Sequence, residues 1–303
     1  MRYIPIRGTF LVVLTGLSAL LGAIPLILAA LLWGSKELAL EYAPFLGEAS
    51  IPWSLTLYTL LGLSLPLSIA PLSYVLWNNM RYSDALLRQV PTFFKGAADG
   101  VRAGMTLERA LTVSAESVGD PLKTEISLVV AHTSLGVPFE EALQRLTWRV
   151  PDPTMKKVAS LLAVAQVSGG RVADVLETAA EMYGMLRGYE DERRARMAPY
   201  VWVTYIALAV FLLTATIITA VFVQPLQTAG IPGLFTPPPP QLFKALFFIS
   251  SYLQAFFGGL VSGKVGRGTV KAGLTHSLVL ILITIAYFNL QEIVLAPMLT
   301  PRF

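Results

Sequence analysis

Five long stretches of the chain contain no charged side chain, and they restrict the possible folds more than any other feature. They cover residues 8–35, 49–80, 197–243, 245–263 and 272–291. About 20 consecutive apolar residues cross the hydrocarbon core of a bilayer as a helix, so each stretch is long enough for one span. Charged residues make up only 14% of the chain, whereas soluble proteins contain about 25%. We expect membrane-spanning helices near 9–33, 53–77, 199–223, 242–262 and 273–296.

The distribution of Lys and Arg orients these spans, because short cytoplasmic loops carry an excess of both residues. The N-terminus contains Arg2 and Arg7 without an acidic neighbour, and the loop before the fifth span is basic. The loop after the first span contains more Glu than Lys. We therefore expect a multi-pass protein of the cell membrane, with the N-terminus and residues 82–197 in the cytoplasm and the C-terminus outside.

The N-terminus also allows a second interpretation. Arg7-Gly8 in front of an apolar run resembles a prepilin leader, which is cut after a basic residue and Gly. Pilins usually carry Glu five residues into the mature chain, where this sequence has Val13, and four further spans do not belong to a pilin. The apolar run is also too long for an ordinary signal sequence. We expect the first span to be retained.

Residues 82–197 differ from the rest of the chain, because they contain most of its charges in nearly equal numbers of both signs. This balance does not favour nucleic-acid binding. Apolar residues recur at steps of three and four, as in an amphipathic helix, and no strand-like alternation is present. The sequence therefore predicts an all-α membrane protein in three parts: a two-span hairpin (1–81), a bundle of about six helices (82–197) and a three-span region (198–303).

A weak internal repeat marks the turns of this bundle. Residues 104–111 (GMTLERAL) are similar to residues 136–143 (GVPFEEAL), and a looser copy begins at Gly170. A glycine that accepts a positive φ ends one helix, and the next helix begins within a few residues. Thr106 is the expected N-cap in the first copy and Pro138 the expected first-turn residue in the second.

The last helix of the bundle, near 181–197, leads through three arginines into the third span. Arg193, Arg194 and Arg196 fit the cytoplasmic anchor of a membrane helix. A nearly continuous helix would also transmit movement of the bundle to the membrane. The two interpretations are compatible.

Chemistry that would make the chain an enzyme is missing from its sequence. The chain has no cysteine, and its two histidines, His132 and His276, lack the spacing of a zinc site. It also lacks a phosphate-binding loop of the Gly-x-x-x-x-Gly-Lys type. Acidic residues are absent from the middle of the spans, with Glu292 near an end, which argues against an ion-coupled transporter. We expect no catalytic residue, cofactor or metal.

Two motifs resemble a known family. The glycine turns of the bundle, a later Ser168-Gly169-Gly170 and the long helix into a span are similar to the type II secretion system F domain. The glycine-rich, basic segment 259–276 resembles the cytoplasmic loop before the last span in the archaeal branch of that family. The chain is thus similar to assembly platforms of archaeal pili and archaella and to the C-type platform of tight-adherence pili.

The resemblance implies a membrane platform of a type IV pilus-like machine, which couples a hexameric cytoplasmic ATPase to the insertion of pilin subunits. Family members carry two F domains or pair as two proteins with one each. This chain shows one F domain, so its partner would be a second copy or a second platform subunit. Membrane lipids are further partners. A transporter or channel subunit with a regulatory domain is the alternative function.

Several residues are expected to contact the ATPase or another partner. They lie in the Ser-Gly-Gly turn, at the end of the last bundle helix and in the basic loop before the fifth span, where a lipid-headgroup role is the simpler interpretation. These residues are Gly169, Gly170, Arg193, Arg194, Arg196, Lys264, Arg267 and Lys271.

Overall fold

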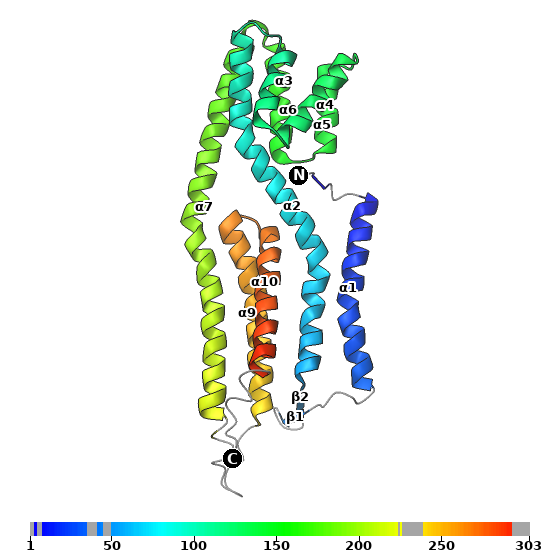
Figure 1. Ribbon diagram of the computed structural model, residues 1–303, viewed down its shortest axis with the longest axis vertical. Helices are drawn as coiled ribbons and strands as arrows, with labels where there is room; N and C mark the ends of the chain where they lie inside the picture. Colours follow the sequence, from blue (N-terminus) through cyan, green and yellow to red (C-terminus); the bar gives the residue numbers. More distant parts are fainter. Residues whose placement is uncertain are drawn as a thin grey trace, which may run out of the picture. The chain divides into compact units, whose positions relative to one another are not determined.

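Five long apolar helices dominate the computed structural model, which describes residues 3–4, 8–34, 41–44, 50–223, 225 and 239–292. Within these residues, each of the five is long and apolar enough to cross a membrane (Figure 1). They are α1 (Gly8–Gly34), α2 (Leu55–Arg102), α7 (Val172–Ile217) with its π-helical end η2 (Ile218–Val223), α9 (Pro240–Arg267) and α10 (Val270–Leu290). The predicted all-α membrane fold with five spans is confirmed. The end of the expected fifth span, 293–296, and the C-terminus lie outside the described residues.

A short hairpin between α1 and α2 was not predicted. Strand β1 (Glu41–Pro44) pairs antiparallel with β2 (Ser50–Trp53), with Glu41 opposite Trp53. Each strand contains a proline, which a two-stranded ribbon tolerates because both of its strands are edges. A proline in a segment of only four residues argues against a strand, so the sequence did not predict this hairpin.

The described contacts divide the chain into two compact units. The domain unit consists of residues 1–7 and 75–196, and the membrane unit of residues 8–74 and 197–303. The borders at 74/75 and 196/197 fall inside continuous helices, α2 of 48 residues and α7 of 46 residues. The change from apolar to charged side chains ends neither helix, and α7 continues through Pro199. The three-part division at 81 and 197 therefore stays a prediction about the membrane borders.

Six helical segments build the domain unit. The end of α2 and the start of α7 enclose α3 (Leu107–Val118), α4 (Leu122–Ser134), α5 (Phe139–Arg149) and α6 (Pro153–Val167). The core centres on Leu86, Phe93 and Phe94 of α2, which are fully buried. Tyr183 of α7 packs near Phe94, with ring centroids 6.0 Å apart.

The repeated turns have the same backbone geometry in two of the three copies. Gly104 and Gly136 both adopt φ +86°, and the Thr106 side chain caps α3 as predicted. Pro138 is the N-cap of α5 and not a first-turn residue, because its ψ of 137° is extended. In the third copy the positive φ, +58°, belongs to Gly169 instead of Gly170.

A buried carboxylate begins α6. Asp152 is 2% exposed and accepts hydrogen bonds from the backbone N–H groups of Thr154, at 2.8 Å, and Met155, at 3.3 Å. Its other oxygen accepts from the Ser83 hydroxyl of α2. The Tyr183 hydroxyl is buried nearby, and burial followed by the charge of Asp152 raises the pKa of Tyr183 to about 12. Asp152 therefore joins the first turn of α6 to α2.

In the membrane unit, α9 and α10 approach so closely that their backbones touch. A Cβ added at Gly263 would lie 1.9 Å from the Gly273 nitrogen, and one at Gly259 would lie 2.2 Å from the Ser277 nitrogen. Small residues permit such approach between membrane helices, where packing replaces the hydrophobic effect as the source of stability. Figure 1 shows the two helices side by side, α9 in orange and α10 in red.

The glycine-rich, basic segment 259–276 is mostly helix, so the loop between the fourth and fifth predicted spans is shorter than the sequence predicts. Helix α9 continues to Arg267, and only Gly268 and Thr269 separate it from α10. Gly268 adopts φ +75° and ends α9 as a left-handed cap. The glycines create the helix contact and are not needed for a flexible loop.

Hydrogen bonds between spans add to this packing. The Tyr252 hydroxyl of α9 donates to the Gly62 carbonyl of α2 at 2.9 Å, and the Ser277 hydroxyl of α10 donates to the Phe256 carbonyl of α9 at 2.7 Å. Lys244 and Glu292, near the ends of α9 and α10, form an ion pair at 3.0 Å. The polar groups therefore join neighbouring helices inside the unit.

Replacing Gly263 by Ala is expected to lower the thermal unfolding midpoint of the chain in detergent. The new methyl group forces α9 and α10 apart, and overpacking of this kind costs about 1–3 kcal/mol. Gly16→Ala in α1 is the matched control, because nothing lies within 4 Å of a Cβ at Gly16. Equal midpoints for the two variants would contradict the close contact.

Replacing Asp152 by Ala is expected to destabilise the domain unit by about 1–3 kcal/mol, because buried donors lose their acceptor. Amide hydrogen exchange should accelerate in the first turn of α6, at Thr154 and Met155. Thr106→Ala, which removes an exposed cap with a 3.4 Å contact, should have a smaller effect on α3. Unchanged amide exchange at Met155 in the Asp152 variant would contradict the role of Asp152 as the hydrogen-bond acceptor at the start of α6.

Candidate functional site

The Ser-Gly-Gly turn lies exposed between α6 and α7. Gly169 and Gly170 belong to the 3-10 helix η1 (Gly169–Arg171), and a Cβ at either position would meet no atom within 4 Å. Close packing therefore does not require glycine here. Gly169 is needed for its positive φ of +58°, which L side chains rarely adopt. The turn is an accessible backbone surface of the domain unit.

The three arginines at the end of the domain unit all have carboxylate partners. Arg193 pairs with Glu190 at 2.9 Å and Arg196 pairs with Glu192 at 2.6 Å, both within α7. Arg194 instead reaches Asp84 of α2, and this hydrogen bond raises the pKa of the Arg194 guanidinium. Arg194 therefore ties the two long helices together inside the domain unit. The sequence alone does not reveal this role, because Asp84 is 110 residues away.

The predicted basic loop is a tight basic turn in the membrane unit. Lys264 and Arg267 occupy the last turn of α9, where positive charge interacts favourably with the helix dipole. Lys271 lies at the start of α10 and is exposed, as is Lys264. Neither lysine has a carboxylate within ion-pair distance among the residues that the structure describes. The turn therefore presents two cations that remain available to an anionic partner.

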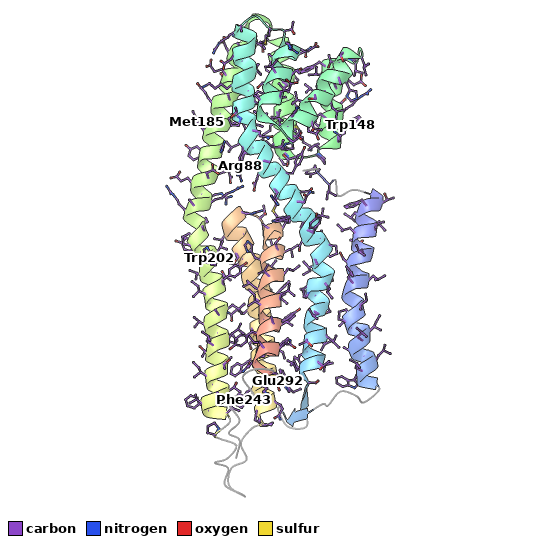
Figure 2. The ribbon with its side chains drawn as sticks, viewed as in Figure 1. Arg88, Trp148, Met185, Trp202, Phe243 and Glu292 are labelled. Carbon is purple, nitrogen blue, oxygen red and sulfur yellow. The ribbon has the colours of Figure 1, made fainter. Side chains whose placement is uncertain are left out.

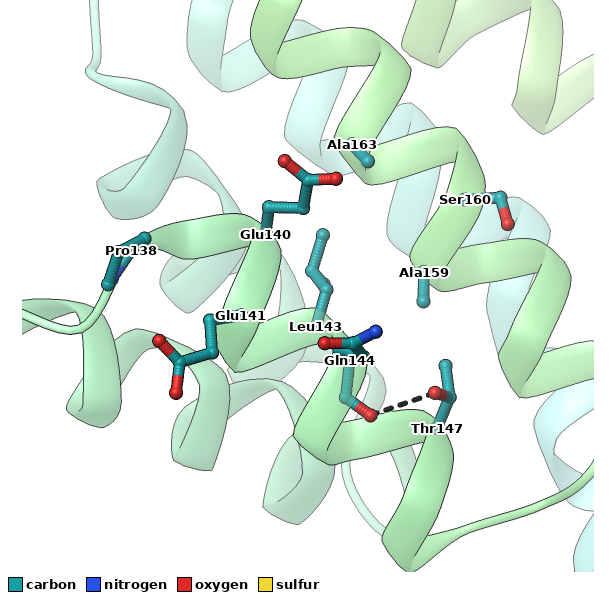
Figure 3. A pocket seen from close by; sticks show the side chains of 9 residues that line it. All are labelled: Pro138, Glu140, Glu141, Leu143, Gln144, Thr147, Ala159, Ser160 and Ala163. Atoms are coloured by element: carbon teal, nitrogen blue, oxygen red, sulfur yellow. Dashed lines mark hydrogen bonds between the residues drawn. The ribbon is translucent and has the colours of Figure 1, made fainter.

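A groove between α5 and α6 was not predicted from the sequence. It has a volume of about 430 Å³, and the buried side chains of Leu143 and Ala159 contribute to its lining. Figure 3 shows Glu140 beside Ala163 at the groove, and Glu141 also lines it. Glu141 pairs with Arg145 at 2.7 Å. Small residues on α6 leave the space, and only the helix pairing in the structure brings them opposite α5.

The two histidines do not form a common site. In the membrane unit, His276 of α10 lies 2.8 Å from the Tyr205 hydroxyl of α7, through its Nδ1 atom. His132 lies in α4 of the domain unit. No group of three or more His, Cys, Asp or Glu side chains that would hold a metal ion occurs in the described part of the chain.

Comparison with known proteins gives one family match and one curated relative. Residues 93–220 match the family model described as "Type II secretion system (T2SS), protein F". An uncharacterized protein of Methanocaldococcus jannaschii is 26% identical over 202 residues, which cover 67% of this chain and 33% of the relative. The chain thus spans a third of the length of that relative. No solved structure matches the chain.

The family match begins at the core residue Phe93 of α2 and ends at residue 220, within the π-helical end of the third span. It includes all four short helices of the domain unit and the whole of α7. The match therefore covers most of the bundle and the helix that follows it, the first of the two motifs on which the resemblance rested, whereas the second motif, residues 259–276, lies outside it. Residues 93–220 are thus similar to the type II secretion system F-domain family, which confirms the resemblance predicted from the sequence.

Proposed function

We propose that the chain is the membrane assembly platform of a type IV pilus-like machine, an archaeal pilus, archaellum or secretion system. The observation that carries this proposal is the extent of the family match, which covers most of the domain unit, from residue 93, and continues through α7. In the proposed orientation, the N-terminus and the domain unit lie in the cytoplasm and the C-terminus lies outside. The chain provides binding surfaces and no catalytic group.

The proposed partners are a hexameric cytoplasmic ATPase, pilin subunits, and a second copy or a second platform subunit. Lys264, Arg267 and Lys271 are proposed to meet an acidic surface of the ATPase, because the two lysines are exposed without a carboxylate partner in the described residues. Lipid headgroups would compete for the same cations. Gly169 and Gly170 are proposed as a second contact, through their accessible backbone.

The arginines have a different proposed role. Since Arg193, Arg194 and Arg196 already pair with carboxylates, they maintain the geometry of α7 and its contact with α2. A force applied to the domain unit by the ATPase would then pass along α2 and α7, because each helix belongs to both units.

The transporter alternative requires ionisable groups along a path through the spans. Lys244 and Glu292 are ionisable, but they pair with each other near the ends of their helices. This pair neutralises its own charge and gives no support to such a path.

Reversing two charges at the basic turn is expected to abolish binding of the ATPase. The double variant Lys264→Glu, Lys271→Glu in lipid nanodiscs should lose co-purification with the secretion-type ATPase of the same organism. Lys156→Glu, Lys157→Glu on α6 is the control, because these lysines are also exposed. Full retention of the ATPase by the basic-turn variant would exclude the turn as its contact, and binding that depends on anionic lipid alone would assign the turn to headgroups.

A charge swap separates the structural role of Arg194 from a partner contact. Arg194→Glu places two carboxylates together and should destabilise the chain by about 1–2 kcal/mol, because the ion pair with Asp84 is half-buried. Adding Asp84→Arg should restore the thermal midpoint and filament formation. If the swap restored stability but filaments stayed absent, Arg194 would contact a partner directly.

A further inference from the structure

Helix α7 exposes a stripe of large apolar side chains inside the domain unit. Met182, Met185, Leu186 and Tyr189 are all exposed, and Tyr189 is 70% exposed. The buried residues of the same helix, such as Leu176 and Tyr183, lie on another face. Figure 2 labels Met185 on the side of α7 away from α3–α6. An exposed apolar stripe of this kind marks an interaction site in proteins.

Lipid does not cover this stripe. The residues that follow it, from Arg187 to Arg196, are dense in charged side chains, which the hydrocarbon core excludes. The stripe belongs to the domain unit, before the third predicted span. Its apolar side chains must therefore face water or another protein.

The spacing of the stripe is that of a two-helix seam. Exposed residues follow each other at alternating steps of three and four, in the order Met182, Met185, Tyr189, Glu192, Arg196. A repeat of this type averages 3.5 residues and keeps one seam facing a partner helix. In the membrane unit, exposed residues of α7 repeat the same steps: Val203, Ile206, Val210, Leu213 and Ile217.

The charges in the seam are self-complementary. Glu192 and Arg196 occupy successive seam positions and pair at 2.6 Å within one chain, with side chains 56% and 71% exposed. In a parallel pair of helices, the Glu192 of each chain lies one layer from the Arg196 of the other. Glu192 of one chain can therefore pair with Arg196 of the other while the three-and-four spacing of the seam is kept. Such pairs fix the register of the two helices.

We propose that this face of α7 binds the same face of α7 in a second copy of the chain, as a parallel two-helix seam. Because α7 continues into a membrane span, two copies in one membrane run in the same direction. A two-fold axis along the helices then places each residue opposite its equivalent, which a symmetric dimer requires. This proposal deepens the proposed function by naming the dimer surface, and it does not depend on the ATPase or on pilin.

Cysteine crosslinking in membranes tests the seam directly, since the natural chain contains no cysteine. Single variants Met185→Cys and Tyr189→Cys should form disulfide-linked dimers under mild oxidation, because seam residues face their equivalents. Gly184→Cys and Asp191→Cys are matched controls, exposed on the same helix but on another face. We expect several-fold more dimer at the seam positions than at the controls.

Three results would overturn the proposal: no dimer at residues 185 and 189, equal dimer at the control positions, or crosslinks from the seam to a different protein. A charge series gives an independent measurement by mass photometry in nanodiscs. Glu192→Arg makes both charged seam positions, 192 and 196, basic in each chain and should shift the dimer to monomer. Adding Arg196→Glu returns one acidic and one basic position to each chain and should restore the dimer. Absence of ATPase binding by the unaltered chain, with the seam crosslinks present, would contradict the proposed function alone.

Discussion

Hydrocarbon cannot hydrogen-bond to a backbone amide, and the architecture of this chain depends on that constraint. Each polar backbone group within a span must find its partner in the same helix, so an apolar stretch of sufficient length is helical. Outside the bilayer the constraint is weaker, but α2 and α7 continue as helices into the domain unit. Continuous helices, α2 before the bundle and α7 after it, therefore connect the two units.

Side-chain chemistry then decides how the helices meet. In the membrane unit, glycine and serine allow the backbones of α9 and α10 to touch at Gly263 and Gly273. In the domain unit, a conventional apolar core forms around Phe93 and Phe94. Buried polar groups such as Asp152 keep their hydrogen bonds and hold the helix ends in place. The contact between α9 and α10 therefore depends on backbone packing, whereas the core of the domain unit depends on side-chain packing.

Much of the fold could be predicted from the sequence, because its signals are local. The apolar stretches indicated the spans, and the glycine turns indicated the helix ends in the bundle. Local signals failed where the outcome depends on a distant partner. The sequence did not show which atoms the glycines of α9 approach, because Gly273 and Ser277 belong to the next helix. The pairing of Arg194 could not be predicted, because its partner Asp84 is far away in the sequence. The α5–α6 groove has no sequence signal, because two helices create it together.

The two-residue turn between α9 and α10 has a consequence for biosynthesis. Gly268 and Thr269 are too few to let one helix enter the bilayer while the other waits outside. With their backbones in contact, the two helices bury each other's small polar groups, such as Ser277. We therefore expect the last two spans to insert together, as one helical hairpin. A stop codon after α9 would remove the partner on which that hairpin depends, so the C-terminal span is required for the one before it.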